Sequence, residues 1–322
     1  MSAPEHFTGL KPVPERATEP VPGPVTGPAG GRQDELLGLP RATADAATAA
    51  DAAATAAGVQ VRELVELGEL DAVYRLYDSI WRPDPKNPPV TTELLRAMTK
   101  AGNYVSGAYD GDELIGACVG FFAAPAEEAM HSHVAGVSGL ARGRSVGFAL
   151  KLHQRAWALQ RGVTAISWTF DPLIRRNAYF NVVKLAARPT EYLTNFYGDM
   201  RDGINGDDDT DRLLVRWQLD DPAVGDAAAR NPSGADATLL SGATVALSND
   251  LGGPVIGSSA GKTLLVAVPA DIEGLRRTDP GTAKAWRAAL REVLGGLLAD
   301  GAQVTGFDRA GWYVLSKEGT AG

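Results

Sequence analysis

RGRSVGFA, residues 142–149, is the stretch of sequence from which the fold of this chain can be reasoned. Residues 130–139 before it, MHSHVAGVSG, are typical of a strand. After it, apolar side chains recur three or four residues apart, which indicates a helix ending near Gly162. The stretch is therefore a turn from a strand into a helix. The first turn of a helix carries unpaired N–H groups and the positive end of the helix dipole, so this turn is a potential anion site.

The side chains of this turn favour a diphosphate as the anion. Gly143 and Gly147 let the backbone approach phosphate oxygens because they lack a Cβ, and Arg142 and Arg144 can add charge-assisted contacts. The turn contains neither the GKS or GKT of a P-loop nor a G-x-G-x-x-G dinucleotide motif. The alternative is a strand–helix turn with basic surface residues, because short glycine-containing turns are common.

Upstream of this turn, the chain changes character near residue 58. Residues 1–57 are rich in Pro, Gly and Ala, with almost no aromatic residues. Such a stretch buries too little apolar surface to offset the entropy of ordering, so we expect a disordered tail, whose alanine-rich end forms at most a transient helix. From there to residue 219 the patterns predict the order β-α-α-β-β-β-α-β-α-β. The expected elements lie at 59–64, 68–81, 91–102, 103–110, 113–125, 130–139, 146–162, 163–172, 175–187 and 212–219.

Downstream, residues 220–239 have the composition of a linker, and residues 240–318 form a second, smaller unit. Its expected elements are strands at 263–269, 303–309 and 311–316 and a helix at 280–301. A unit of this size can hardly hold an independent core, so we expect it to pack on the first domain, 58–219. The fold class is therefore α/β (α+β), with a small C-terminal αβ unit.

Composition excludes several classes of protein. The net charge of −8 argues against a nucleic-acid binder, and no apolar run approaches the ~20 residues of a membrane span. A single cysteine, Cys118 in an apolar strand, cannot form an internal disulfide and is expected in the core. With no secretory signal pattern, these features fit a reducing, cytoplasmic location. The acidic residues between Asp199 and Asp211 could bind a metal, but a solvated loop is the expectation, and we predict no metal site.

The order of elements and the turn together resemble a known family. The pattern Arg144-x-x-Gly147-x-Ala149, after a strand and opening a helix, is similar to the R/Q-x-x-G-x-G/A motif of the GNAT (Gcn5-related N-acetyltransferase) superfamily. The resemblance spans about residues 59–219. A wider set of stretches resembles a less-studied branch of predicted acyltransferases with an extra C-terminal region: WTFDPL at 168–173, RNA at 176–178, NFYG at 195–198, TDR at 210–212, and AWR at 285–287 with Arg291.

The resemblance implies a mostly antiparallel twisted sheet flanked by helices, and transfer of an acyl group from CoA, most often to an amine. The backbone of the 142–149 turn would hold the CoA pyrophosphate. The strand at 131–138 would pair with the pantetheine arm, and the strand at 165–170 would splay away from it. The implied acyl-CoA-binding residues are Val137, Arg142, Gly143, Arg144, Ser145, Val146, Gly147, Phe148, Ala149 and Asn177. Acetyl-CoA and succinyl-CoA are both left open as the donor.

Acyl transfer from a thioester needs a deprotonated amine, a polarised carbonyl and a protonated leaving thiolate. His131 and His133 lie two residues apart and share a strand face, so either, and His133 first, is the candidate base; both could instead be hydrogen-bond partners at a sheet end. Glu127 and Glu128 are weaker candidates. Backbone N–H groups of the splayed strand would polarise the carbonyl.

The proton donor to the thiolate is less clearly marked. The family commonly has a tyrosine two residues before the Lys of the 175–187 helix, where this chain has Val182. Tyr179 lies one turn earlier, and Tyr197 and Tyr192 are further candidates; each could equally be a core aromatic. This departure leaves a non-catalytic acyl-CoA-binding or regulatory protein as the alternative function, and a different acyl-CoA reaction as a third.

The expected acceptor is a small-molecule amine or amino acid. Trp81 and Arg82, with the proline-rich loop after them, would line the far side of the cleft. Arg176 and Arg212, and also Arg175, could pair with a substrate carboxylate, or with the nearby acidic residues instead. A homodimer is left open.

Overall fold

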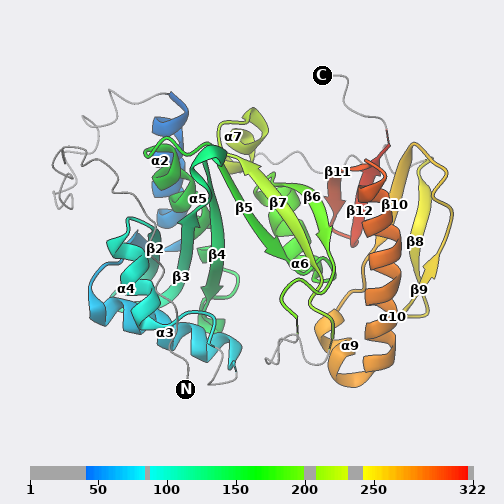
Figure 1. Ribbon diagram of the computed structural model, residues 1–322, viewed down its shortest axis with the longest axis horizontal. Coiled ribbons are helices and arrows are strands. Elements are labelled where there is room, and N and C mark those ends of the chain that lie inside the picture. The colour runs from blue at the N-terminus through cyan, green and yellow to red at the C-terminus, as the bar shows by residue number, and fades with distance from the viewer. Residues whose placement is uncertain (1–40, 84–87, 199–207, 231–241, 318–322) are drawn as a thin grey trace, which may run out of the picture. The chain divides into compact units, whose positions relative to one another are not determined.

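The computed structural model describes residues 41–83, 88–198, 208–230 and 242–317. Residues 1–40, Asp199, Asp202 and Asp207 of the acidic stretch, and part of the predicted linker (231–239) lie outside the described residues. Two sheets organise the described chain (Figure 1). No helix among the described residues combines the length and apolar character needed to cross a membrane.

The first sheet has seven strands in the order β1-β2-β3-β4-β5-β7-β6. All its neighbours are antiparallel except β4 and β5, which run parallel and are joined by the helix α5 (Val146–Leu159). The strands are β1 (Gln60–Glu63), β2 (Tyr104–Asp110), β3 (Glu113–Phe122), β4 (Ala129–Val137), β5 (Ala165–Phe170), β6 (Arg188–Leu193) and β7 (Arg212–Gln218). The predicted mixed, mostly antiparallel sheet flanked by helices is confirmed.

Helices cover both faces of this sheet because its strands alternate their apolar side chains. Ala117 and Val119 of β3 pack with α3 (Leu67–Trp81) and α4 (Thr92–Lys100), whereas Cys118 between them packs with the core on the α5 side. Pro89, just before α4, therefore lies on one face of β4, and the N-terminus of α5 lies on the other. Cys118 is buried, as expected.

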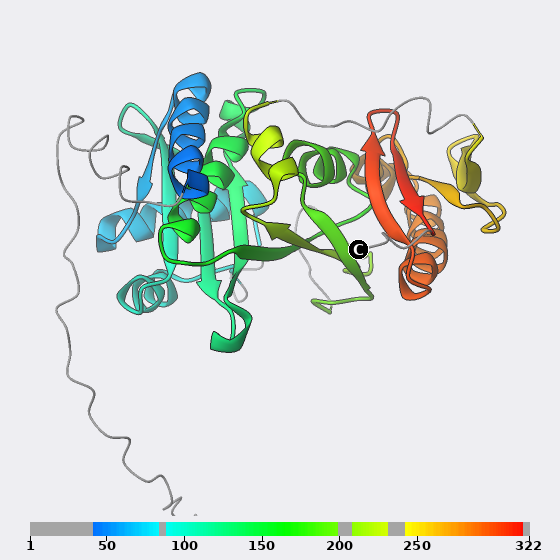
Figure 2. The ribbon, with the colours of Figure 1, turned by 90° about the horizontal axis from the view of Figure 1, so that it is seen from above.

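A helix precedes β1, so the prediction of a disordered tail is wrong for residues 41–57. These residues form α2 (Arg41–Ala57), which packs on α5 (Figures 1 and 2). Its buried residues are Thr43, Ala46, Ala50, Ala53 and Ala57, spaced three or four apart. The prediction failed because a docking helix was expected to need large apolar side chains. A stripe of alanines instead lets two helix backbones approach closely.

The second sheet has the order β11-β12-β10-β8-β9. Its strands are β8 (Thr244–Asp250), β9 (Gly253–Ile256), β10 (Thr263–Ala267), β11 (Gln303–Asp308) and β12 (Trp312–Ser316). The helical segments between β10 and β11 are α9 (Ile272–Thr278), α10 (Pro280–Leu290), a π-helical turn (Arg291–Gly295) and α11 (Gly296–Ala299). The strands β8 and β9 were not predicted.

This C-terminal unit repeats the second half of the first sheet. β8 runs parallel to β10, β10 antiparallel to β12, and β12 antiparallel to β11, as in the series β4-β5-β7-β6. In both units a helix with a π-helical turn joins the corresponding strands, β5 to β6 in the first unit and β10 to β11 in the second. In the first unit it consists of α6 (Arg175–Ala178) and the π-helical turn Tyr179–Lys184. Between β8 and β10 there is no counterpart of α5, because β9 stands there instead.

The first part of the predicted linker contains a helix. Residues 222–228 form α7 (Pro222–Ala228), capped by Asp221 and anchored by buried Val224 and Ala227. The two units also contact each other directly, since the buried Tyr313 hydroxyl of β12 donates to Pro172 O at 2.9 Å, just after β5.

Candidate active site

The turn before α5 presents unpaired backbone donors. Among the described residues, the amides of Ser145, Val146 and Gly147 donate to no protein atom, since the first helical bonds come from Phe148 and Ala149 to Ser145 O. A Cβ placed on Gly147 would have Val137 Cγ2 at 3.8 Å as its nearest neighbour, so the space in front of this turn is open. The N-terminus of α5 is therefore free to take an anion.

The two arginines of this turn have different surroundings. Arg144 forms an ion pair with Asp110 at 2.5 Å, and its Nη2 donates to Ala57 O at 3.3 Å and Gly58 O at 3.0 Å. Arg144 thus ties the end of α2 and the strand β2 to the turn. Arg142 is exposed and makes no ion pair with any residue that the structure describes. Of the two predicted phosphate-binding arginines, only Arg142 has a guanidinium without a structural partner in this part of the chain.

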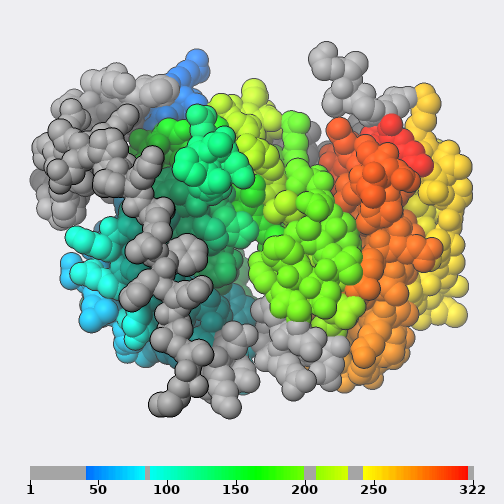
Figure 3. Space-filling view, viewed as in Figure 1, coloured from blue at the N-terminus to red at the C-terminus, as the bar shows by residue number. Residues whose placement is uncertain are grey.

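β4 and β5 separate after three residue pairs. Their parallel ladder ends at His131 opposite Ser167, and the strands run apart from there (Figure 1). Ser138 donates its N–H to Ile115 O of β3, so by alternation the N–H groups of Ala135 and Val137 point to the edge of β4 that faces away from β3. The space-filling view shows the surface hollowed between the two parts of the sheet (Figure 3). The fork therefore exposes a strand edge with free donors.

The two predicted histidines flank the start of this fork. β4 has a bulge, because Val119 pairs with Val134 and Gly120 with Ser132, which leaves His133 as the extra residue. The rings of His131 and His133 are 6.4 Å apart, and both lie against Phe121, so they share a face as predicted. Burial, with His133 and Lys151 nearby, lowers the pKa of His131 to about 4.

His133 is better placed than His131 to accept a proton. It is exposed, and its Nε2 lies 3.4 Å from Pro89 O. Because a carbonyl can only accept, this contact favours the tautomer with the proton on Nε2 and the lone pair on Nδ1. Trp81, at the end of α3, covers the neighbouring part of β4. A Cβ on Gly136 would lie 2.6 Å from the Trp81 ring, so only glycine fits beneath it.

Tyr197 lies across the fork on the β5 side. Its hydroxyl is 3.0 Å from Thr169 Oγ1 of β5, and its side chain is 41% exposed. The guanidinium of Arg212 lies 5.4 Å from the centre of the Tyr197 ring, and its Nη1 donates to Asp211 O. Arg212 is buried, and burial lowers its pKa while Asp171 opposes this. The structure thus brings Tyr197 and Arg212 together, on the opposite side of the fork from His133.

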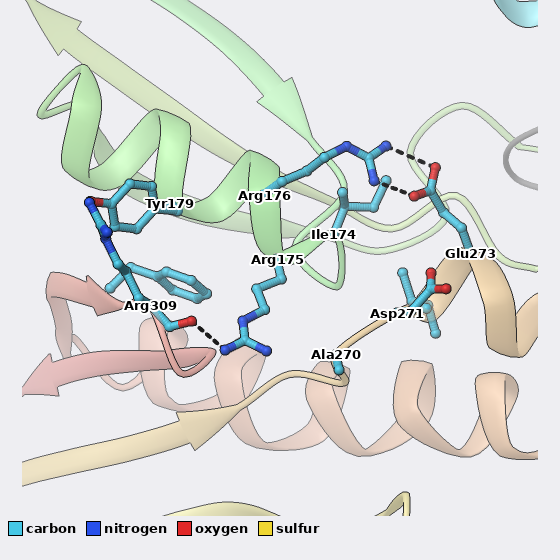
Figure 4. A pocket seen from close by; sticks show the side chains of 10 residues that line it. Ile174, Arg175, Arg176, Tyr179, Ala270, Asp271, Glu273 and Arg309 are labelled. Carbon is cyan, nitrogen blue, oxygen red and sulfur yellow. Dashed lines mark hydrogen bonds and ion pairs between the residues drawn. The ribbon is translucent and has the colours of Figure 1, made fainter. Parts of the chain in front are cut away.

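Tyr179, Arg176 and Asn177 belong to a different hollow. Tyr179 accepts a hydrogen bond from Arg309 Nε at 3.0 Å, and Arg176 pairs with Glu273 (Figure 4). These residues line a hollow of about 540 Å³ between α6 and the C-terminal unit, and Asn177 lines a neighbouring one of about 500 Å³. Neither hollow includes a residue of the fork. Tyr179 and Arg176 are therefore engaged by the C-terminal unit.

A buried ion-pair network that the sequence did not predict joins the end of β5 to the C-terminal unit. Asp171 accepts from Arg287 Nη1 and Nη2, both at 3.0 Å, and from Arg276 Nη2 at 2.6 Å. Both arginines also bind Asp208. Burial would raise the pKa of Asp171, but the two guanidinium groups hold it well below its ordinary value.

A second ion pair lies beside this network, between the π-helical turn after α10 and the start of β7. Arg291 binds Asp211 at 2.7 Å and Asp209 at 2.6 Å. With Asp208, the described part of the acidic stretch is therefore paired with arginines rather than a solvated loop, which corrects the prediction. The described residues contain no cluster of His, Cys, Asp and Glu that could hold a metal. The signal in the sequence was the late Arg287 and Arg291, on the helix of the unit that was expected to pack on the first domain.

Comparisons with known proteins give likenesses for about half of the chain. No family model and no curated protein matches. The ribosomal-protein-S18-alanine N-acetyltransferase of Escherichia coli is 13% identical, with a TM-score of 0.39, over 50% of this chain and 94% of its own.

Two other solved structures are similar to the same extent. An N-acetyltransferase of Staphylococcus aureus Mu50 is 15% identical, with a TM-score of 0.40, over 50% of this chain and 98% of its own. The yncA protein of Salmonella typhimurium, solved with its cofactor acetyl-CoA, is 16% identical, with a TM-score of 0.40, over 53% of this chain and 99% of its own. Residues 60–218 form one mixed sheet with a single parallel pair, β4 and β5, whose strands are joined by the helix α5.

Proposed function

We propose that this chain is a CoA-dependent N-acyltransferase that moves an acetyl or succinyl group to the amine of a small molecule or amino acid. One observation carries the proposal: the free amides at the start of α5 open beside the unpaired edge of β4. A diphosphate fits the first feature and an extended amide-containing arm fits the second, and CoA contains both groups.

The turn supports diphosphate binding in its backbone as well as its charge. Ser145 has a φ of 62°, a left-handed conformation that favours glycine. Reading the R/Q-x-x-G-x-G/A pattern from Arg142 places Ser145 and Gly147 at its two small-residue positions, two places earlier than the alignment that starts at Arg144. In this register Arg142, which has no ion-pair partner among the described residues, is the arginine of the motif, and Arg144 is its structural neighbour.

His133 is the proposed base. The Nδ1 of its neutral tautomer accepts a proton from the acceptor ammonium, and the amine then attacks the thioester carbonyl by direct transfer. An unpaired N–H of β4 next to the bulge polarises the carbonyl oxygen. His131 is less suited, because with its pKa near 4 it is a weaker base at neutral pH.

Tyr197 is the proposed proton donor to the departing thiolate. Its exposed hydroxyl lies on the β5 side of the fork, whereas the Tyr179 hydroxyl is bound by Arg309. For the acceptor, Trp81 beside β4 and Arg212 behind Tyr197 are the proposed contacts. A role of Arg176 in binding substrate would require its pair with Glu273 to open.

The test is to measure CoA release from acetyl-CoA and succinyl-CoA with a panel of amines and amino acids, together with CoA binding by calorimetry. Gly147→Glu places a carboxylate in front of the free amides and should abolish CoA binding with an unchanged melting temperature. The matched control is Gly68→Glu, at an exposed position of α3 where a side chain meets open space. Unchanged CoA affinity in Gly147→Glu would exclude the turn as the binding site.

A non-catalytic acyl-CoA-binding protein is the second candidate, favoured by Val182 at the position where the family has tyrosine. Binding of acyl-CoA at the turn with no CoA release for any acceptor would support it. Product mass spectrometry in the same assay would identify a different acyl-CoA reaction.

A further inference from the structure

Lys151 is a buried lysine of α5 that has no role in the mechanism proposed above. Its Nζ donates to Ser132 Oγ at 2.7 Å and Gln154 Oε1 at 3.1 Å, and lies 3.8 Å from the centre of the Trp168 ring. The residue is 5% exposed. Within the described ranges, no carboxylate pairs with it. The core therefore holds an ammonium group that is satisfied by neutral partners alone.

A buried ammonium group without a counter-charge lowers the stability of the folded state. Taking an ammonium out of water without a counter-charge disfavours its charged form, and burial lowers the pKa of Lys151 to about 8. A methionine has a similar length and would fill the same space without that cost. Packing alone therefore gives no reason for a lysine here, and its charge needs another explanation.

The position of Lys151 Nζ suggests a reason for its charge. Ser132 and Trp168 are the residues that directly follow His131 and Ser167, the last pair of the β4–β5 ladder. Nζ therefore bridges the two strands at the point where they part. It approaches from the α5 side, whereas His133 lies on the opposite face of the sheet with Phe121. A thioester carried along the edge of β4 from the α5 turn would end beside this point.

We propose that Lys151 is a positioning residue of the transferase, whose positive charge beneath the base of the fork stabilises the thiolate as it leaves. The inference rests on the proposed function. In the step, the acceptor nitrogen bonds to the carbonyl carbon, and the C–S bond breaks with its electron pair on sulfur. The acceptor ammonium gives one proton to His133 before the attack, and the nitrogen releases its second proton to solvent as the C–S bond breaks, which leaves a neutral amide. The sulfur takes a proton from Tyr197, which regains one from solvent. Lys151 transfers no proton; it acts through space from behind Ser132 and Trp168.

The other groups around Nζ are neutral in the working pH range. Cys118 faces it from β3 with a thiol whose pKa burial raises, and His131 on β4 has its pKa lowered. Gln154 is on its own helix, and Asn181 of the π-helical turn binds the indole N–H of Trp168. Lys151 is therefore the charge that changes here as the pH passes through about 8. Its ammonium is present below that pH and lost above it.

The experiment measures kcat and KM for acyl-CoA between pH 6 and 9.5 in the full-length wild type, Lys151→Met and Lys151→Arg. The wild-type kcat should fall above pH 8, where Lys151 loses its charge. Lys151→Met should lower kcat at pH 7 on the order of 10²-fold, with little change in KM, and lack the falling limb. Lys151→Arg should keep more activity and also lack the falling limb, because arginine stays charged.

The control is Arg155→Met. Arg155 is a buried cation one turn further along α5 that binds Leu219 O at 2.8 Å, away from the fork, so its loss should leave kcat and its pH profile unchanged. A folded Lys151→Met with kcat within threefold of wild type overturns the proposal. If the variants do not fold, a wild-type kcat without a fall above pH 8 overturns it. Absence of wild-type turnover with every acceptor refutes the proposed function instead.

Discussion

Replacing Asp171 by asparagine should cost the fold about 3–5 kcal/mol, the usual cost of removing one partner from a buried ion pair. The carboxylate accepts three bonds from Arg276 and Arg287 and one from Leu173 N at 3.0 Å, and its side chain is 4% exposed. The amide would leave two buried guanidinium groups with Asp208 as their shared counter-charge.

Urea denaturation followed by tryptophan fluorescence measures this loss. With an m-value of about 3 kcal/mol/M, the midpoint should fall by about 1 M or more. Asp71→Asn is the control, because Asp71 pairs with Arg75 on the exposed surface of α3 and should cost less than about 1 kcal/mol. If Asp171→Asn cost no more than Asp71→Asn, the network would not be what holds the C-terminal unit to β5.

The pH dependence gives a second check on Asp171. Its pKa is depressed in the folded state, so its contribution is fully present above the ordinary aspartate pKa of 3.8 and is lost as the pH falls through the lower folded value. The difference between wild type and Asp171→Asn should therefore be constant from pH 5 to 8. A double-mutant cycle with Arg287→Met should recover part of the loss, since it removes one of the two guanidinium groups that would otherwise share Asp208.

Three further outcomes are expected. Ala50→Glu, which buries a carboxylate between α2 and α5, should lower stability by about 3 kcal/mol in urea denaturation, whereas Ala52→Glu on the exposed side should change it little. His133→Gln should lower kcat by about 10²-fold with CoA affinity unchanged by calorimetry; a full kcat would exclude His133 as the base. Lys151→Met should be more stable than wild type at pH 7 by about 3 kcal/mol, a gain that disappears by pH 10.5, because the lysine pKa falls from 10.5 unfolded to about 8 folded.

The sequence predicted the local features of the fold well, because they depend on neighbouring residues. The helix start at Val146 and the strand before it were predicted from a turn and a periodic apolar pattern. The sharing of a face by His131 and His133 followed from strand geometry and survives the bulge. The open amides of the turn belong to the same class of prediction, since every helix leaves its first donors unpaired.

Features made by residues far apart in the sequence were not predictable in this way. Asp171 and Arg287 are 116 positions apart, and nothing near either of them indicates the other. Arg144 looked like a phosphate ligand because its partners, Asp110 and the end of α2, come together only in the fold. The burial of Lys151 has no local signal, since the same helix also carries His153, Gln154 and Arg155 and lysines are usually exposed.

The C-terminal unit repeats four strands of the first sheet, and the differences between the two units affect how many ligands one chain can bind. The C-terminal unit has the strands of a second fork, β8 and β10, but the strand β9 replaces the helix whose first amides would neutralise a diphosphate. Under the proposed function, each polypeptide should therefore bind one equivalent of CoA rather than two. The arginines of the C-terminal unit instead bind Asp171 and Asp208, and these ion pairs hold the unit to the end of β5.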